Sequence, residues 1–401
     1  MMKKTFLYIL ILISTCMGAK GQAVGDSIVA SLLTCSPGTK SYSLYGHTGL
    51  RIRNLTQGLD LVFNYGVFNF QRPHFTWHFI LGECDYEVAA YPFDAFVEEY
   101  AHRGSSVVEQ QFNLTPEETN RLFSLLVINC QPENKVYRYN FLQNNCTTKA
   151  RDIVEQAVVG EVRYEEAQEH PTYRQLLHEM TEDYPWSEVG NDLLLGAACD
   201  TVLSDRATQF LPGQLMEYAA RAQIFDEKNN RRPLVARTSV LLEANAHQRQ
   251  LASQGGWEPR VSPLVAGLMA LAAALLVMLV EYLTRRQLWG IDILLMLLQG
   301  LAGVLLTFML LFSQHPTVDS NWQVWVFNPL PLLCIVWVVK CAIRQQRCLY
   351  HYLNLLVLVL FVVLMPWIPQ TFSALTLPLA LVLLTRPVSY LIRYNRKPKE
   401  A

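Results

Sequence analysis

The order of apolar and polar residues divides the chain into two parts at about residue 262. Before that point the two kinds of position alternate in short runs separated by turn residues, as in a soluble domain. After Pro263 the chain is largely apolar, and we count five stretches that can cross a bilayer as helices. They span about residues 263–283, 289–312, 325–343, 349–367 and 371–391. The third is less regular, because Pro329 and Pro331 stand near its start.

The segments that connect these spans indicate their orientation. Residues 284–287, 340–348 and the tail after 392 are basic, whereas 313–323 and 366–370 are not. Because basic connecting segments stay in the cytoplasm, five spans place residue 262 outside it. We therefore expect a transmembrane domain over 263–392, followed by a cytoplasmic tail over 393–401.

The N-terminus has the layout of a secretory signal. Lys3 and Lys4 precede an apolar core over 5–14, and small residues follow up to Ala23. The alternatives are a lipobox at Cys16 and an uncleaved anchor. Each of them exports the segment that follows, in agreement with the orientation of the spans. The sequence thus predicts a signal peptide over 1–23 and an exported domain over 24–262.

The exported domain mixes strand and helix patterns. Apolar alternation and strand-forming residues predict extended segments at 47–55, 59–70, 84–92 and 135–141. Helical spacing appears at 115–130, 164–183 and 213–230, and the first of these helices has Thr115 as N-cap and Glu118 to close a capping box. We expect an α+β domain with a small antiparallel sheet.

One further helix begins with a cysteine. In "FLQNNCTTKARDIVEQAV", residues 141–158, the apolar positions after Cys146 have helical spacing, and Asn144 or Asn145 can cap the helix. Cys146 then lies in the first turn, where the helix dipole and free N–H groups favour a thiolate. Such a thiolate is a candidate nucleophile. The alternative is a small buried cysteine without chemistry.

A nucleophilic cysteine needs a base, and the exported part holds seven histidines. His47 opens a strand and has small neighbours, which suits an imidazole that reaches across a cleft. For any single histidine a solvated or structurally bonded side chain is the alternative. Five cysteines (Cys35, Cys84, Cys130, Cys146 and Cys199) lie in this domain. The odd number leaves at least one thiol free or paired between molecules.

The net charge and the motifs of the sequence give no support to several other classes of function. The net charge of −1 gives no reason to expect nucleic-acid binding. No C-x-x-C spacing for a metal and no phosphate-binding loop occur in the sequence, so we expect neither metal nor cofactor.

The segments "YGHTGLRI", "NYGVF", "NNCTTKARDI", "DLLLGAACD" and "QFLPGQL" resemble the exported domain of the Lnb-type lipoprotein N-acyltransferases. The loop "SQHPTVDSNWQVWVFNPL" resembles that family's outer membrane-facing loop, and the likeness runs over nearly the whole mature chain. The order of histidine before cysteine is similar to that of the circularly permuted papain-like fold. Lecithin:retinol acyltransferase-like enzymes use that fold to take acyl groups from phospholipids.

The resemblance implies roles for particular residues. Cys146 is the nucleophile and His47 the base, and Asn64 orients the imidazole, with Asp60 as the alternative to Asn64. Backbone N–H groups at the start of the cysteine helix meet the oxyanion. His315 and Asn321, in the outer loop, bind a head group or close the site.

Three other acidic residues are interpreted as structural. Asp200 matches a position of the family but has no expected chemistry. Glu281 and Asp292 lie near the cytoplasmic ends of spans, where we expect ion pairs with Arg285 and Arg286.

The implied activity is a thiol acyltransfer at the inner membrane, with the catalytic domain in the periplasm. An acyl chain passes from a phospholipid, through a cysteine thioester, to the α-amino group of a diacylglyceryl-cysteine lipoprotein. One competing interpretation is a membrane-anchored, papain-like cysteine hydrolase (peptidase or amidase) of the cell envelope. A receptor or scaffold without catalysis is another.

Overall fold

The computed structural model describes residues 28–54, 56–68, 73–253 and 258–395. By their contacts these residues form two units. The first combines the chain up to Pro73 with residues 84–169 and 204–255, and the second combines 74–83, 170–203 and the chain from 256 onward. The expected signal peptide over 1–23 and the last residues of the expected tail, 396–401, lie outside the described residues.

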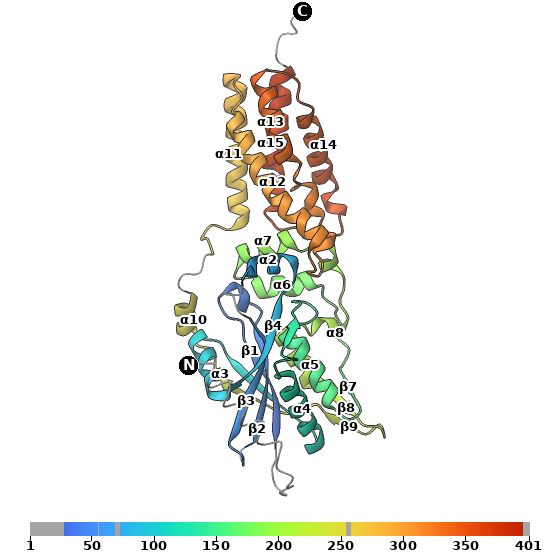
Figure 1. Cartoon of the computed structure of the whole chain (residues 1–401). Coiled ribbons are helices and arrows are strands. Elements are labelled where there is room, and N and C mark those ends of the chain that lie inside the picture. The colour runs from blue at the N-terminus through green and yellow to red at the C-terminus, as the bar shows by residue number, and fades with distance from the viewer. Residues whose placement is uncertain (1–27, 55, 69–72, 254–257, 396–401) are drawn as a thin grey trace, which may run out of the picture. The chain divides into compact units, whose positions relative to one another are not determined.

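The first unit contains an antiparallel sheet of seven strands in the order β10-β5-β1-β2-β3-β4-β6 (Figure 1). Its strands are β1 (Val29–Cys35), β2 (His47–Asn54), β3 (Leu59–Val67), β4 (Asp85–Pro92), β5 (Val107–Phe112), β6 (Val136–Arg138) and β10 (Val235–Leu242). The expected α+β class with an antiparallel sheet is confirmed. The sheet is larger than the sequence indicated, because β1, β5 and β10 are added to the four expected strands.

Both faces of this sheet are buried. On one face Leu50, Ile52 and Phe63 pack in a core with residues of α4 (Pro116–Asn129), α5 (Cys146–Ala157) and α9 (Pro212–Arg221). On the other face Leu33 and Val62 pack against α3 (Phe93–Arg103). The sheet is therefore the middle layer of three. The start of β2 and the end of β3 lie beside the start of α5.

The expected helix over 115–130 is confirmed as α4, with its capping box. The Thr115 hydroxyl accepts from the Glu118 amide at 3.2 Å, and the Glu118 carboxylate accepts from the Thr115 amide at 2.8 Å. The expected helix over 213–230 is wrong in its second half. After α9 the chain forms β8 (Gln223–Phe225), which lies between β7 (Glu161–Arg163) and β9 (Arg231–Pro233) in a second, three-stranded sheet.

The remaining helices of the first unit are short: η1 (Ser41–Ser43), α8 (Asp205–Thr208) and α10 (Ala246–Ser253). The expected helix over 164–183 is helical only from Tyr173 onward, as α6 (Tyr173–Thr181) of the second unit. That unit also contains α2 (Phe75–Leu81), α7 (Pro185–Leu194) and η2 (Ala197–Asp200) before its membrane helices.

Five long apolar helices complete the second unit and run side by side in Figure 1. They are α11 (Pro263–Thr284), α12 (Trp289–Phe312), α13 (Leu330–Ile343), α14 (Leu349–Leu364) and α15 (Thr376–Asn395), with η3 (Val318–Ser320), η4 (Trp322–Trp325) and η5 (Met365–Trp367) in the connections. All five are long and apolar enough to cross a membrane, when η4 is counted with α13 and η5 with α14. The helix α13 itself starts only at Leu330, after Pro329, as the two prolines suggested.

The acidic residues of the spans are ion-paired, but not with the expected partners. Arg386 on α15 donates to Glu281 on α11 at 2.8 Å and to Asp292 on α12 at 2.6 Å. All three residues are buried. The expected pairing with Arg285 and Arg286 is therefore wrong, because a buried arginine more than 90 residues away in the sequence occupies both carboxylates.

Candidate active site

Cys146 is the first residue of α5, and a network around Asn145 fixes its position. The Asn145 side-chain oxygen accepts from the amides of Thr147 and Thr148 at 2.9 Å each, which makes Asn145 the N-cap. Its side-chain NH₂ donates to the carbonyls of Phe141 and Phe210 at 2.8 Å each. The cap therefore ties the first turn of α5 to two other segments of the first unit.

His47 and Asn64 lie on neighbouring strands and are hydrogen-bonded to one another. Gly49 of β2 is opposite Asn64 of β3, so His47, two residues earlier, has its side chain on the same face as Asn64. His47 Nε2 bonds the side-chain oxygen of Asn64. Because an amide oxygen only accepts, Nε2 carries the proton, and Nδ1 is left for the Cys146 thiol.

A glycine allows the cysteine to lie beside these strands. Gly66 has φ +86°, which side-chain-bearing residues rarely adopt, and it lies in a register shift between Asn64 and Val67. A Cβ atom at Gly66 would be 3.7 Å from the Cβ of Cys146. The backbone of β3 thus passes directly beside Cys146 at the register shift.

The electrostatics of the pair favour a thiolate and an imidazolium. Burial on its own raises the pKa of Cys146. The charge of His47, its hydrogen bond to the thiol, and hydrogen bonds from the Thr48 amide and the Thr147 hydroxyl together outweigh burial and lower that pKa to about 7. Burial lowers the pKa of His47, but Cys146 and the bond to Asn64 raise it by more. Each partner therefore stabilises the charged form of the other.

This pairing predicts how alkylation of Cys146 depends on pH. The rate of reaction with iodoacetamide should rise through a midpoint near pH 7, since the thiolate is the reacting form and the pKa is about 7. In His47→Ala the midpoint should move above the ordinary thiol value of about 8.5, because burial is then less compensated. Peptide mass spectrometry of the full-length protein in detergent resolves the label at each cysteine.

Cys130 and Cys199 are internal controls for that titration. Both are free thiols, and burial raises the pKa of each to about 12. They should remain unlabelled while Cys146 reacts. A Cys146 profile that does not change in His47→Ala would contradict the assignment of His47 as its partner.

Several residues beside the thiol were not singled out from the sequence. Thr48 and Thr147 share a hydrogen bond of 3.1 Å, and both also bond the Cys146 sulfur. Tyr137 and Tyr139 lie close enough for the Cys146 charge to raise their pKa values, although burial raises them more. The alternation in "VYRYNF" places both tyrosines on one face of an extended segment, and this signal was present in the sequence.

Two acidic residues named from the sequence have other partners. Asp60 accepts from Arg51 at 2.6 and 2.7 Å, so it belongs to an ion pair, whereas Asn64 has the bond to His47. Asp200 accepts from the buried Arg174 at 3.0 and 3.1 Å. These contacts favour Asn64 over Asp60 and support the structural interpretation of Asp200.

His315 and Asn321 belong to the second unit, and both have structural contacts there. His315 Nε2 donates to the Phe79 carbonyl of α2 at 2.6 Å. Asn321 caps η4, and its NH₂ donates to the Leu193 carbonyl of α7 at 2.7 Å. A role of either residue in binding a head group or closing the site stays a prediction.

Among the described residues, His178, Glu188 and Asp192 are grouped as metal ligands can be, with ligand atoms within 4.8 Å of one another. However, Asp192 already accepts from Arg174 at 2.6 Å and from His178 at 2.9 Å. The pKa of His178 is raised mainly by its bond to Asp192. The bonds of Asp192 to Arg174 and His178 therefore explain this cluster as a structural polar network.

Comparison with known families agrees with this architecture. The model of the Lnb N-terminal periplasmic domain matches residues 18–179, and that of the Lnb transmembrane domain matches residues 255–397. No curated protein and no solved structure matches the chain. The two models occur in this order along one chain, and the second covers all five apolar helices. The chain therefore belongs to the Lnb family, as a multi-pass membrane protein with a periplasmic N-terminal domain.

Proposed function

We propose that the protein is a thiol acyltransferase of the inner membrane. It moves an acyl chain from a phospholipid, through a thioester on Cys146, to the α-amino group of a diacylglyceryl-cysteine lipoprotein. The observation that carries the proposal is the bonded set of Cys146, His47 and Asn64 in a chain of the Lnb family, whose membership implies lipoprotein N-acylation.

In the first half-reaction the Cys146 thiolate attacks the carbonyl carbon of a phospholipid ester. The tetrahedral intermediate collapses as the ester C–O bond breaks. The His47 imidazolium gives its Nδ1 proton to the leaving alkoxide, so that a lysophospholipid departs and an acyl thioester remains. The N-cap uses the amides of Thr147 and Thr148, so the Cys146 amide is the first helix N–H left for the oxyanion.

In the second half-reaction the lipoprotein amine attacks the thioester. His47 is now neutral and takes the amine proton on Nδ1, the C–S bond breaks, and the thiolate returns as the amide forms. The Asn64 oxygen holds the Nε2 proton throughout, which keeps Nδ1 directed at the reacting atoms. Two half-reactions that share one thioester predict ping-pong kinetics.

The acyl-enzyme is the direct test. Wild-type protein incubated with phospholipid and no acceptor should carry one acyl mass adduct on the peptide that contains Cys146, and hydroxylamine should remove it. Mass spectrometry of lipoprotein N-termini should show the third acyl chain only in cells that contain the protein. If no adduct forms and the N-termini do not differ, the proposal is wrong.

A cysteine hydrolase of the cell envelope remains the second candidate, because it uses the same cysteine and histidine. The five apolar helices favour the acyltransferase, since a soluble peptide substrate does not require a lipid environment. The two are separated by the product. A hydrolase releases a peptide fragment or a free acid with water as the acceptor, and added lipoprotein does not change the product.

A further inference from the structure

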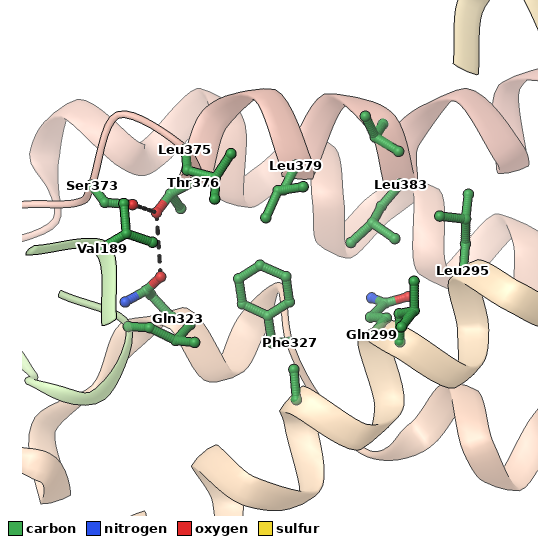
Figure 2. Close-up of a pocket in the computed structure, with 14 residues that line it drawn as sticks. Val189, Leu295, Gln299, Gln323, Phe327, Ser373, Leu375, Thr376, Leu379 and Leu383 are labelled. Atoms are coloured by element: carbon green, nitrogen blue, oxygen red, sulfur yellow. Dashed lines mark hydrogen bonds between the residues drawn. The ribbon is translucent and has the colours of Figure 1, made fainter. Parts of the chain in front are cut away.

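The second unit contains a cavity of about 280 Å³ among its membrane helices (Figure 2). Helices α12 and α15 form two of its walls, and α7 and the segment that begins with η4 contribute the remainder. Its walls are mainly apolar: Leu193, Leu295, Ala302, Phe327, Leu379 and Leu383. A cavity with such walls does not retain water, and leaving it empty would forfeit the dispersion contacts of the lining side chains.

The polar groups at one end of the cavity are uncharged. The Thr376 hydroxyl donates to the side-chain oxygen of Gln323 at 3.3 Å and shares a bond of 3.2 Å with Ser373. In Figure 2 these three residues stand at the end opposite to Leu383 and Leu295. Gln299 lies near Leu383, and its NH₂ donates to the Val326 carbonyl at 2.7 Å. The Gln323 NH₂ gives one N–H to the Asp192 carbonyl at 2.6 Å, so its second N–H can donate to an ester carbonyl. A phosphate would instead favour arginine or lysine.

One wall of the cavity continues into the outer surface of α12. Leu298 lines the cavity and is 57% exposed. Leu294 and Leu301, at 55% and 59%, extend this exposed surface along the same side of the helix. Because α12 is a candidate membrane span, the surface at Leu298 faces lipid chains. A chain from the bilayer can therefore enter sideways past this residue.

The volume sets the size of the occupant. A cavity of about 150 Å³ holds benzene, so one of about 280 Å³ has room for roughly ten to twelve carbon atoms in a row. That is most of one acyl chain but less than two. Thr376 begins α15 on the periplasmic side of the last span, so an ester group near it belongs to the outer leaflet.

We propose that this cavity binds one acyl chain of a glycerophospholipid from the outer leaflet, with the chain's ester group at Thr376, Ser373 and Gln323. That this lipid is the acyl donor rests on the proposed function; that it binds here does not. A glycerophospholipid is favoured over the lipoprotein acceptor because the opening at Leu298 meets the bulk lipid of the bilayer.

The test uses phospholipids that carry a diazirine at a defined carbon of one acyl chain, in vesicles containing the full-length Cys146→Ala protein. This variant has no Cys146 thiol to take the acyl chain, so the probe phospholipid stays intact. A diazirine near the ester should label peptides that contain Thr376 or Gln323, and one near the chain end should label those that contain Leu383 or Leu295. Labelling that does not change with diazirine position would overturn the proposal.

A matched pair of variants tests occupancy. Ala302→Phe fills the cavity and should lower labelling of the α15 peptide about tenfold, the effect of losing ~1.4 kcal/mol of binding. Val304→Phe places the same side chain on the exposed surface of α12, outside the lining of the cavity, and should leave labelling unchanged. Equal labelling in both would contradict a chain in the cavity. If Ala302→Phe does not fold, the positional labelling above decides.

Competition identifies the lipid, and thioester formation separates this inference from the proposed function. Unlabelled phospholipid should displace the probe, whereas displacement only by a diacylated lipopeptide would overturn the choice of phospholipid. Positional labelling without any thioester on wild-type Cys146 would leave the lipid site standing and reject the acyltransferase. A normal thioester rate in a folded Ala302→Phe would overturn the cavity as the donor site and leave the acyltransferase standing.

Discussion

Replacing Cys146 by serine is expected to abolish lipoprotein N-acylation while the protein still folds and inserts into the membrane. A serine hydroxyl has nearly the volume of the thiol but does not ionise near neutral pH, so His47 has no anion to pair with. His47→Ala should lower the rate by about 10²- to 10⁴-fold, the usual contribution of a general base. The measurement is the rate of third-chain addition to a diacylated lipoprotein in vesicles.

The pattern across variants is as informative as the losses. Because the two residues act as a unit, the double variant should be no worse than the worse single one. Asn64→Ala should be milder than His47→Ala, since it removes only the group that fixes the tautomer. Cys130→Ser is the matched control, because Cys130, like Cys146, is a partly buried free thiol of the same unit, and it should retain the rate. If Cys146→Ala still acylates lipoproteins at the normal rate, the mechanism is wrong and a receptor or scaffold becomes the better interpretation.

The second large effect concerns stability and is centred on Arg386. This side chain joins three helices, because it donates to Glu281 on α11 and Asp292 on α12 from its place on α15. Arg386→Met should destabilise the membrane domain by about 3–5 kcal/mol, since it leaves two buried carboxylates without their cation. Denaturation in mixed detergent micelles, followed by tryptophan fluorescence, measures the change.

A combined variant separates the loss of charge balance from the loss of packing. Adding Glu281→Gln and Asp292→Asn to Arg386→Met removes the unpaired charges and should recover most of the stability. Arg285→Met is the control, because Arg285 is exposed, and it should change the free energy of unfolding by less than about 0.5 kcal/mol. Destabilisation of similar size in the triple variant would show that packing around Arg386 dominates.

The sequence was sufficient to predict the features that depend on residues close together in the chain. These are the capping box of α4, the start of α5 at Cys146 and the five apolar spans. The strand β1 was missed because its run "VASLLTC" is buried on both faces and therefore does not alternate. The strands β5 and β10 were missed too, and their place in the sheet depends on partners far away in the sequence.

The candidate site was predictable in its principal residues but not in its surroundings. The sequence pointed to His47 and Cys146 because each stands at the start of an element. The sequence already favoured Asn64, with Asp60 as the alternative, and the register of β2 against β3 and the pairing of Asp60 with Arg51 support that order. By contrast, the partner of Glu281 and Asp292 could not be found locally, because Arg386 lies on another span.

The division of the chain into units limits how it can be cut for biochemistry. The helix α2 and residues 170–203 precede the membrane helices in sequence but pack in the second unit. Gln314 donates to the Leu81 carbonyl of α2 at 2.8 Å, and Gln323 to the Asp192 carbonyl at 2.6 Å. A secreted fragment that ends at residue 255 would lose these partners. The half-exposed rings of Trp77 and Phe79 would lose Phe308 and His315, and Leu193 and Leu194 of α7 would lose the core against which they pack. To express the first unit alone, replacing 74–83 and 170–203 with short polar linkers is therefore preferable to simple truncation.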